Sequence, residues 1–136
     1  IRSALGYSKF IPRSDGNMVR DFLFVKDVVG LYKIMAEYCS ANPELLRGEI
    51  FNAGSNKPVS VRYMLSEIFR SVGKVQELNE ITEKMKDRKT VGEIQYQHMS
   101  FEKVKDFFGW TPEWSIEKGI HETVAWYEKY LKSIRA

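Results

Sequence analysis

Arg20 and Asp21 stand side by side at the start of a short apolar run, and Arg20 is the residue best suited to bind an anion. The guanidinium group is planar and presents several N–H donors, so it recognises phosphate and carboxylate groups with paired hydrogen bonds. Phe22 follows directly and offers an aromatic surface beside the cation. The same pattern also fits an arginine that only pairs with Asp21 or points into solvent, and Arg20 alone does not decide between the two.

Other side chains are poorly placed for catalysis. Tyr7 and Lys9 are two residues apart, whereas a tyrosine and a lysine that act together on a helix need to be one turn apart. His98 and His121 are the only histidines, and no cysteine accompanies them, so they do not predict a metal site. These observations predict no catalytic residue in the chain. No glycine-rich turn follows a predicted strand, so the sequence also predicts no binding loop for the phosphates of a dinucleotide cofactor.

The elements that must position Arg20 are predicted around it. Residues 22–25 are aromatic and β-branched, which favours a short strand, and Asp27 is expected to cap the helix that follows. That helix carries an apolar stripe that predicts a core face (Val28, Leu31, Tyr32, Met35 and Tyr38). A second strand is expected at residues 50–52, which makes residues 27–56 a strand–helix–strand region with a parallel crossover.

The rest of the chain alternates turns and amphipathic helices. Ser60 and Ser115 are expected to cap helices, and Gly73 and Gly109 to end them, while Ser100 caps a short helix between. Residues 14–17 are expected to form a turn and residues 74–78 a short strand. Charges of both signs crowd residues 80–89, which predicts a solvated, mobile loop. Trp110 is expected to be a packing anchor.

Composition limits the classes of function. The chain has 136 residues, of which 43% are hydrophobic and 29% charged, as in one globular domain. The net charge of +3 is small and the basic residues are scattered, so nucleic acid is not an expected partner. No apolar run is long enough to span a bilayer, so a membrane is not expected either. The single cysteine, Cys39, fits a reducing, cytoplasmic location and is expected to be a buried structural thiol.

Motifs in this order resemble a known family. Arg-Asp-Phe-x-x-Val-x-Asp-Val at residues 20–28 and Gly-x-x-Phe-Asn-x-Gly-Ser at residues 48–55 are followed by a pattern from Gly92 to Pro112 and by Gly119 to Tyr127. Together they resemble the C-terminal portion of extended short-chain dehydrogenases, the NAD-dependent epimerases and 4,6-dehydratases of nucleotide sugars. Among these, the enzymes similar to CDP-glucose 4,6-dehydratase are nearest.

The resemblance implies a fold and a set of binding residues. It implies a mixed α/β fold that forms a single domain over residues 1–136. This domain would be the small, helix-rich substrate-binding lobe with short strands, and the cofactor-binding Rossmann lobe of the family would be absent. In the family, residues 27–56 pack on that lobe, which holds NAD. The resemblance places a phosphate contact on Arg20, the nucleotide near Phe22, and an assisting amide on Asn56. Many members carry a second phosphate-binding arginine where this chain has Thr90, so that role would pass to Arg88.

These expectations lead to two hypotheses about function. In the first, the chain grips the nucleotide diphosphate of a sugar nucleotide for an NAD-dependent dehydratase or epimerase, and it is inactive alone. In the second, it is a stand-alone truncated binding or assembly module with no enzymatic activity. Either way, a helix and a strand that normally cover another lobe would be left with apolar surface. We therefore expect the chain to self-associate or to come from a longer protein.

Overall fold

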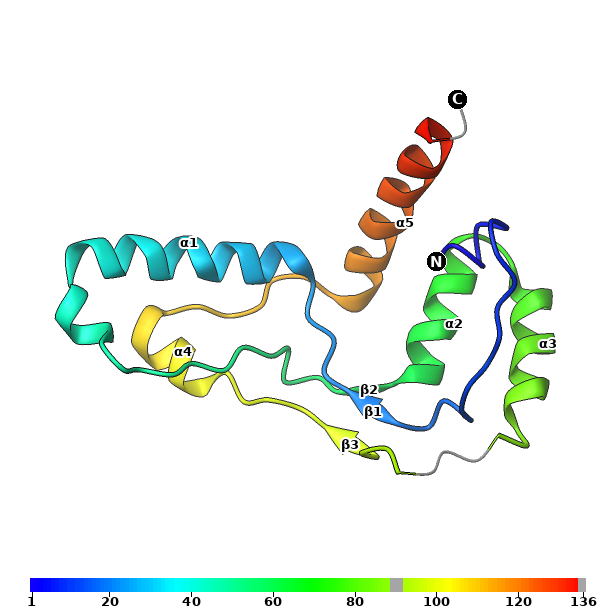
Figure 1. Cartoon of the computed structure of the whole chain (residues 1–136), viewed down its shortest axis with the longest axis horizontal. Helices are drawn as coiled ribbons and strands as arrows, with labels where there is room; N and C mark the ends of the chain where they lie inside the picture. The colour runs from blue at the N-terminus through cyan, green and yellow to red at the C-terminus, as the bar shows by residue number, and fades with distance from the viewer. Residues whose placement is uncertain (89–91, 135–136) are drawn as a thin grey trace.

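A sheet of very short strands lies at the centre of the protein, with helices at both ends (Figure 1). The structure is a computed structural model and describes residues 1–88 and 92–134. The elements are β1 (Val19–Arg20), α1 (Val25–Ala41), η1 (Pro43–Leu46), β2 (Val59–Ser60), α2 (Val61–Ser71), α3 (Val75–Met85), β3 (Tyr96–Gln97), α4 (Glu102–Phe108) and α5 (Ile116–Ser133). The predicted mixed α/β fold is confirmed.

The sheet places Arg20 on its central strand. The strand order is β2-β1-β3, and β1 runs antiparallel to β2, with Val19 opposite Ser60. Strand β1 runs parallel to β3, with Arg20 opposite Gln97. A parallel pair needs a long connection, and here that connection contains α1, α2 and α3. Arg20 is therefore fixed between two segments that are distant in sequence.

Two hydrophobic clusters lie on opposite sides of this sheet. The first joins the N-terminal segment to α2 and α3 (Ala4, Leu65, Phe69, Leu78 and Met85). The second joins α1 to α4 and the loop after it (Leu31, Val104 and Trp110), which confirms Trp110 as a packing anchor. Helix α5 packs against α2 and extends away from the sheet (Figure 1). The separation of the clusters gives the protein an elongated shape.

Several predicted helix boundaries are confirmed. The Ser60 hydroxyl accepts the Tyr63 backbone N–H at 3.0 Å, and the Ser115 hydroxyl accepts that of Lys118 at 3.3 Å. Gly109 ends α4 in the left-handed region, with φ +67°. The cap predicted at Ser100 is wrong, because α4 begins at Glu102 with Phe101 in the N-cap position and no side-chain cap; the Ser100 hydroxyl accepts the Glu102 backbone N–H at 3.2 Å from outside the helix. Serine side chains thus cap the starts of α2 and α5, and a glycine ends α4, as the sequence indicates.

The strand predicted at residues 22–25 is wrong. Residues 21–24 have no regular structure, and α1 begins at Val25 with Phe24 in the N-cap position. Asp27 does not cap this helix, because it lies inside the first turn and its carboxylate binds backbone groups of a distant loop. Tertiary contacts therefore determine this helix start.

Three further predictions are corrected. Residues 48–56 contain no strand, so the parallel crossover predicted for residues 27–56 is wrong. Residues 48–56 are instead held by contacts to α4, including an ion pair of 2.6 Å between Glu49 and Lys103. Residues 74–78 open α3 instead of forming a strand, and α3 continues to Met85 through most of the predicted loop. Cys39 is exposed, and Tyr32, predicted to be core, is 66% exposed.

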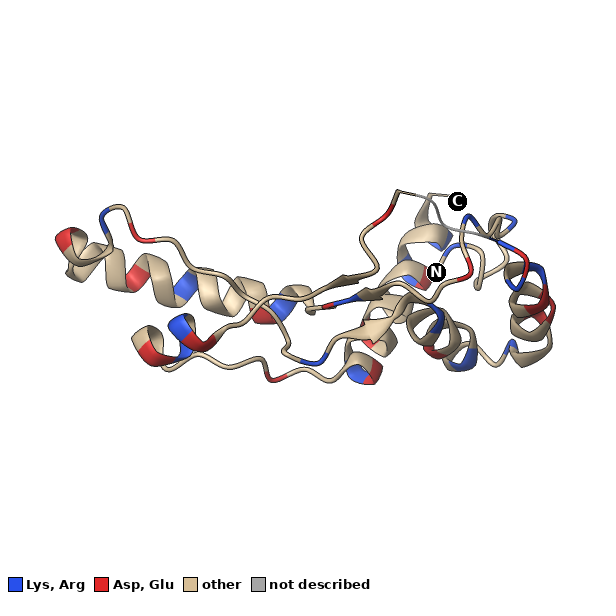
Figure 2. Ribbon diagram, turned by 90° about the horizontal axis from the view of Figure 1, so that it is seen from below, with Lys and Arg blue, Asp and Glu red and all other residues tan. Residues whose placement is uncertain are grey.

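Charge is spread over the protein without a single-sign face in this view (Figure 2). Ion pairs within α2, around α3 and within α4 join oppositely charged residues three positions apart, such as Arg70 with Glu67. Within residues 1–88 and 92–134, no helix has the length and apolar character needed to cross a membrane.

Candidate anion-binding groove

Arg20 and Phe22, two of the residues singled out from the sequence, line the same groove. Its volume is about 460 Å³, and it runs between the N-terminal segment and α2. Most of its wall is apolar (Phe10, Ile11, Val61, Met64, Leu65 and Met85). Arg13 and Arg20 are the charged side chains among the described residues that line it. A cationic group on an apolar wall suits a ligand that carries both an anionic group and a flat ring.

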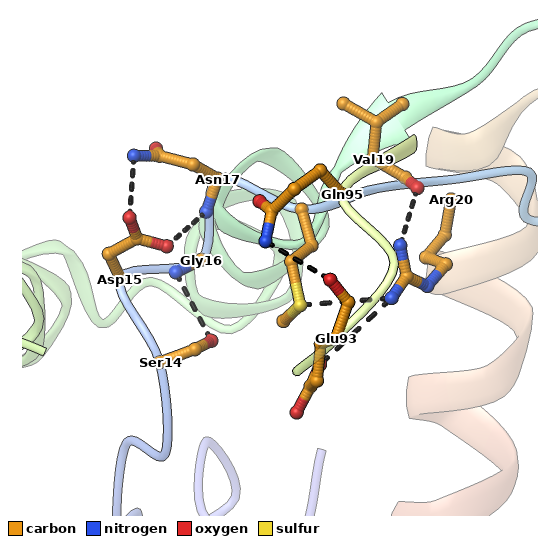
Figure 3. A network of polar contacts seen from close by, with 9 residues as sticks. Ser14, Asp15, Gly16, Asn17, Val19, Arg20, Glu93 and Gln95 are labelled. Carbon is orange, nitrogen blue, oxygen red and sulfur yellow. Dashed lines mark hydrogen bonds and ion pairs between the residues drawn. The ribbon is translucent and has the colours of Figure 1, made fainter. Parts of the chain in front are cut away.

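Arg20 is only partly engaged by its neighbours (Figure 3). One terminal nitrogen, Nη1, donates to the Val19 carbonyl at 2.8 Å, and Nη2 lies 3.7 Å from the Met18 sulfur. Among the described residues, the carboxylate that pairs with it is that of Glu93, with Nη2 4.0 Å from Oε2, the outer limit of an ion pair. The Arg20 side chain is 26% exposed. Its remaining N–H donors are therefore accessible to an added anion.

Asp21 holds the segments beside the groove together. Its Oδ1 accepts the Ser55 N–H at 2.9 Å and also the Ser55 hydroxyl, and its Oδ2 accepts the Met99 N–H at 3.4 Å. Gly54 is buried against it, and a Cβ there would lie 2.2 Å from Oδ2. Sequence reasoning offered only Arg20 as a partner for Asp21, and the contacts to Ser55 and Met99 depend on segments that are 34 and 78 residues away. Asp21 is a structural residue.

The other two predicted site residues do not line this groove. Asn56 is exposed, and its φ of +55° places it in the left-handed region that asparagine tolerates, which supports a role in the turn. Arg88 is exposed just after α3. Its backbone N–H donates at 3.1 Å to the backbone carbonyl of Met85, which lines the groove. Thr90, where the second phosphate contact was expected, lies outside the described residues.

A second, more polar pocket of about 380 Å³ lies between α2 and the start of α5. The Tyr63 hydroxyl donates to Glu117 Oε1 at 2.9 Å. Hydrogen bonds from the Glu117 backbone N–H, from Ser115 and from Tyr63 hold the pKa of Glu117 below its ordinary value, and the same contact raises the pKa of Tyr63. Since Glu117 already uses the N–H groups at this helix start, the pocket does not favour an added anion.

The described residues do not fit a dinucleotide cofactor. A pyrophosphate cradle needs a glycine-rich turn between a strand and a helix. The turns that follow β1 and β3 contain no glycine before the next helix, and β2 enters α2 directly at Val61. Across the described ranges, no group of three or more His, Cys, Asp or Glu side chains is placed to hold a metal ion. The described residues that line the groove are therefore suited to binding a ligand.

Comparison with known proteins supplies a context for this groove. A family model described as GDP-mannose 4,6 dehydratase matches residues 1–123. The UDP-glucuronate 4-epimerase of Thermodesulfobacterium geofontis is 28% identical over 123 residues, which are 90% of this chain and 34% of that protein. The chain thus spans about a third of the length of the curated relatives it matches.

Two solved structures are similar throughout most of the chain. The dTDP-glucose 4,6-dehydratase of Bacillus anthracis, solved in complex with NAD, superposes with a TM-score of 0.68 at 29% identity, over 93% of this chain and 37% of that one. The UDP-glucose 4-epimerase of Thermotoga maritima, solved with UDP-glucose, gives a TM-score of 0.63 at 26% identity, over 96% of this chain and 38% of that one.

Proposed function

Because the chain belongs to the family of GDP-mannose 4,6-dehydratase and related nucleotide-sugar dehydratases and epimerases, we propose that it binds the nucleotide diphosphate of a sugar nucleotide. The observation that carries the proposal is the position of Arg20, on the central strand and at the wall of an apolar groove. Arg20 binds a phosphate, and Phe22 packs beside the nucleotide. A relative of known structure was solved with UDP-glucose, which supports this class of ligand.

Asn56 and Arg88 have smaller parts in the proposal. Asn56 lies one residue after Ser55, which Asp21 holds beside Arg20's strand, so its amide can reach a ligand that extends from the groove. Arg88 follows α3, whose last residue, Met85, lines the groove. Both side chains would contact the ligand outside the groove itself, and their loss should cost less affinity than loss of Arg20.

In this proposal the described residues bind the ligand, and other residues carry out the reaction on the sugar. NAD-dependent chemistry needs a cofactor site, and the described part of the chain does not fit one. We propose that another segment or chain supplies that site, and that this chain alone has no dehydratase or epimerase activity. A cytoplasmic location, where sugar nucleotides are made and used, is part of the same proposal.

A second candidate function, a non-enzymatic binding or assembly module, is favoured by uncovered apolar surface. Val25, Val29 and Tyr32 are exposed along one face of α1 and are four and three residues apart, so they form one stripe. Trp126 and Tyr130 are exposed on α5, and Ile134 is exposed directly after its last residue. A helix with apolar residues on two faces is usually covered on both. We propose that another lobe or another copy of the chain covers these faces.

The test is a thermal-shift titration of the whole chain with CDP, dTDP, GDP and UDP. A ligand present at 100 times its dissociation constant adds about 2.7 kcal/mol to the free energy of unfolding. We expect one nucleotide to raise the melting temperature most, and Arg20→Gln to remove that effect. Arg47→Gln is the control, because Arg47 is exposed and pairs only with Glu44 among the described residues. An Arg20→Gln protein that responds like the wild type refutes the proposal.

A further inference from the structure

Arg13 is a second arginine on the groove that contains Arg20. Arg13 is one of the residues that line that groove, and none of the described carboxylates lines it. Two positive groups in one mainly apolar groove repel each other unless an anion lies between them or beside them. The charge of the groove therefore favours a ligand with more than one negative charge.

The backbone that carries Arg13 is held firmly. Pro12 and Ser14 on either side are buried, and the Ser14 hydroxyl accepts the Gly16 N–H at 3.3 Å (Figure 3). Arg62 of α2 donates through Nη2 to the Asp15 carbonyl at 2.6 Å and through Nε at 3.2 Å. A residue on so constrained a turn loses little backbone freedom when it binds a ligand.

Gly16 shows how closely this turn packs. A Cβ at Gly16 would lie 2.5 Å from the Met85 side chain and 3.3 Å from the Arg62 backbone nitrogen, and its φ is +76°. The turn therefore rests directly on α2 and on the end of α3, the two helices that supply most of the apolar wall of the groove. The packing of this turn against α2 and α3 therefore both shapes the groove and fixes the position of the Arg13 backbone beside it.

The three arginines of this region differ in how they are used. Arg62 is committed to the Asp15 carbonyl, and Arg20 donates to the Val19 carbonyl while facing Glu93 at 4.0 Å. For Arg13, which is exposed, the structure records no hydrogen bond or ion pair within the described part of the chain. An arginine with free donors beside a groove is a binding group for phosphate.

We propose that Arg13 is the second anion-binding residue of the groove, so that Arg13 and Arg20 together bind the two phosphates of a diphosphate. This rests on the proposed function, and it extends it with the expectation that the groove binds a diphosphate more tightly than a monophosphate. The apolar wall between α2 and the N-terminal segment takes the flat base. The ligand class is a nucleoside diphosphate or its sugar ester.

The test compares CDP, dTDP, GDP and UDP with their monophosphates by calorimetric titration of the whole chain. We expect Arg13→Gln to weaken binding of the preferred diphosphate about tenfold, as loss of one charge-assisted contact does. The monophosphate of the same base should lose clearly less affinity. Arg13→Lys, which keeps the charge but loses the planar fork, should lie between wild type and Arg13→Gln. Arg47→Gln controls for the change in net charge.

The outcomes separate this inference from the proposed function. If Arg20→Gln abolishes diphosphate binding while Arg13→Gln behaves like Arg47→Gln, the groove binds the ligand and the role of Arg13 is wrong. Equal losses for monophosphate and diphosphate would also overturn it, because Arg13 would then contact the base or the first phosphate only. If no nucleotide binds to the wild-type chain, both proposals fail.

Discussion

The Asp27 carboxylate accepts the backbone N–H of Glu113 at 3.0 Å, a contact between residues 86 positions apart. Its second oxygen accepts the N–H of Trp114 at 3.3 Å. Asp27 is buried, with 5% of its surface exposed, so water cannot replace it as the partner of these groups. One side chain thus fixes the loop before α5 onto the first turn of α1, next to the segment that carries Arg20 and Phe22.

Asp27→Ala is expected to lower the free energy of unfolding by about 2–4 kcal/mol, because it leaves two backbone donors without an acceptor in a partly buried place. Chemical denaturation measures this directly. Asp106→Ala is the control, since Asp106 is an exposed residue of α4, and its loss should change stability by less than about 0.5 kcal/mol. Equal effects of the two substitutions would show that the Asp27 contacts add nothing to stability.

Alanine substitutions at two glycines, Gly54 and Gly30, should change the stability of the protein in opposite directions. A Cβ at Gly54 would lie 2.2 Å from the Asp21 carboxylate and 2.5 Å from the Met99 carbonyl, whereas a Cβ at Gly30 meets nothing within 4 Å. Gly54→Ala should therefore destabilise the protein by about 2 kcal/mol or more through forced movement of Asp21. Gly30→Ala, in the middle of α1, should stabilise it by about 0.5–1 kcal/mol. Melting temperatures that move in the same direction would contradict this account.

The sequence predicted the ends of several helices because the residues that set them act locally. Ser60 and Ser115 bind N–H groups three residues ahead, and Gly109 adopts a backbone conformation that favours glycine. Such signals depend only on neighbours in the chain. The mixed α/β class, by contrast, was predicted from the family resemblance, because the strands predicted from local signals at residues 22–25, 50–52 and 74–78 are not where the structure has strands.

Long-range contacts explain what the sequence did not reveal. Asp27 looked like a helix cap, but its partners are 86 and 87 residues away. Residues 50–52 looked like a strand from their apolar side chains, yet Lys103 binds the Ile50 carbonyl at 2.9 Å and lies over the Phe51 ring. Arg13 precedes the turn predicted at residues 14–17 and was not singled out from the sequence, since only the fold shows that it lines the groove with residues of α2. Each of these depends on which distant segments meet.

Glu93 competes with a ligand for Arg20. Its carboxylate lies 4.0 Å from Nη2 of Arg20 and is half exposed, so the ion pair is weak and an anion must displace it. Glu93→Gln should therefore tighten binding of the preferred nucleoside diphosphate by up to about fivefold, which corresponds to about 1 kcal/mol. Calorimetric titration checks this. Glu44→Gln removes the same charge far along the chain from Arg20, and if it gives an equal gain, the effect is only one of net charge.

The contact between Tyr63 and Glu117 gives a prediction about pH. The pKa of Glu117 is below its ordinary value chiefly through its own backbone N–H, then through Ser115 and Tyr63. Tyr63→Phe should raise this pKa part of the way back, because the two larger contributions remain. Nuclear magnetic resonance titration of the side-chain carboxyl measures the change. The pKa of Glu122, lowered by Lys26, is an internal control that should not move.

The sign of the effect on stability follows. A carboxylate with a lowered pKa in the folded state stabilises the fold above its unfolded pKa, and that contribution is lost as the pH falls through the folded value. Tyr63→Phe should therefore reduce stability more at neutral pH than in acid, where Glu117 is protonated in both proteins. A loss of stability that does not depend on pH would mean that Tyr63 acts by packing alone.

The uncovered faces of α1 and α5 predict that the isolated chain self-associates as its concentration rises. Val29 is 51% exposed in the middle of the α1 stripe, and Trp126 is 57% exposed on α5. Large apolar surfaces of this kind mark contact sites. Val29→Glu and Trp126→Glu should each lower the average mass measured by light scattering at high concentration. Lys84→Glu on α3 is the control, because it changes charge on an exposed residue outside both helices without removing apolar surface. A protein that stays monomeric at every concentration would show that these faces do not bind one another, and would leave another lobe as the partner that covers them.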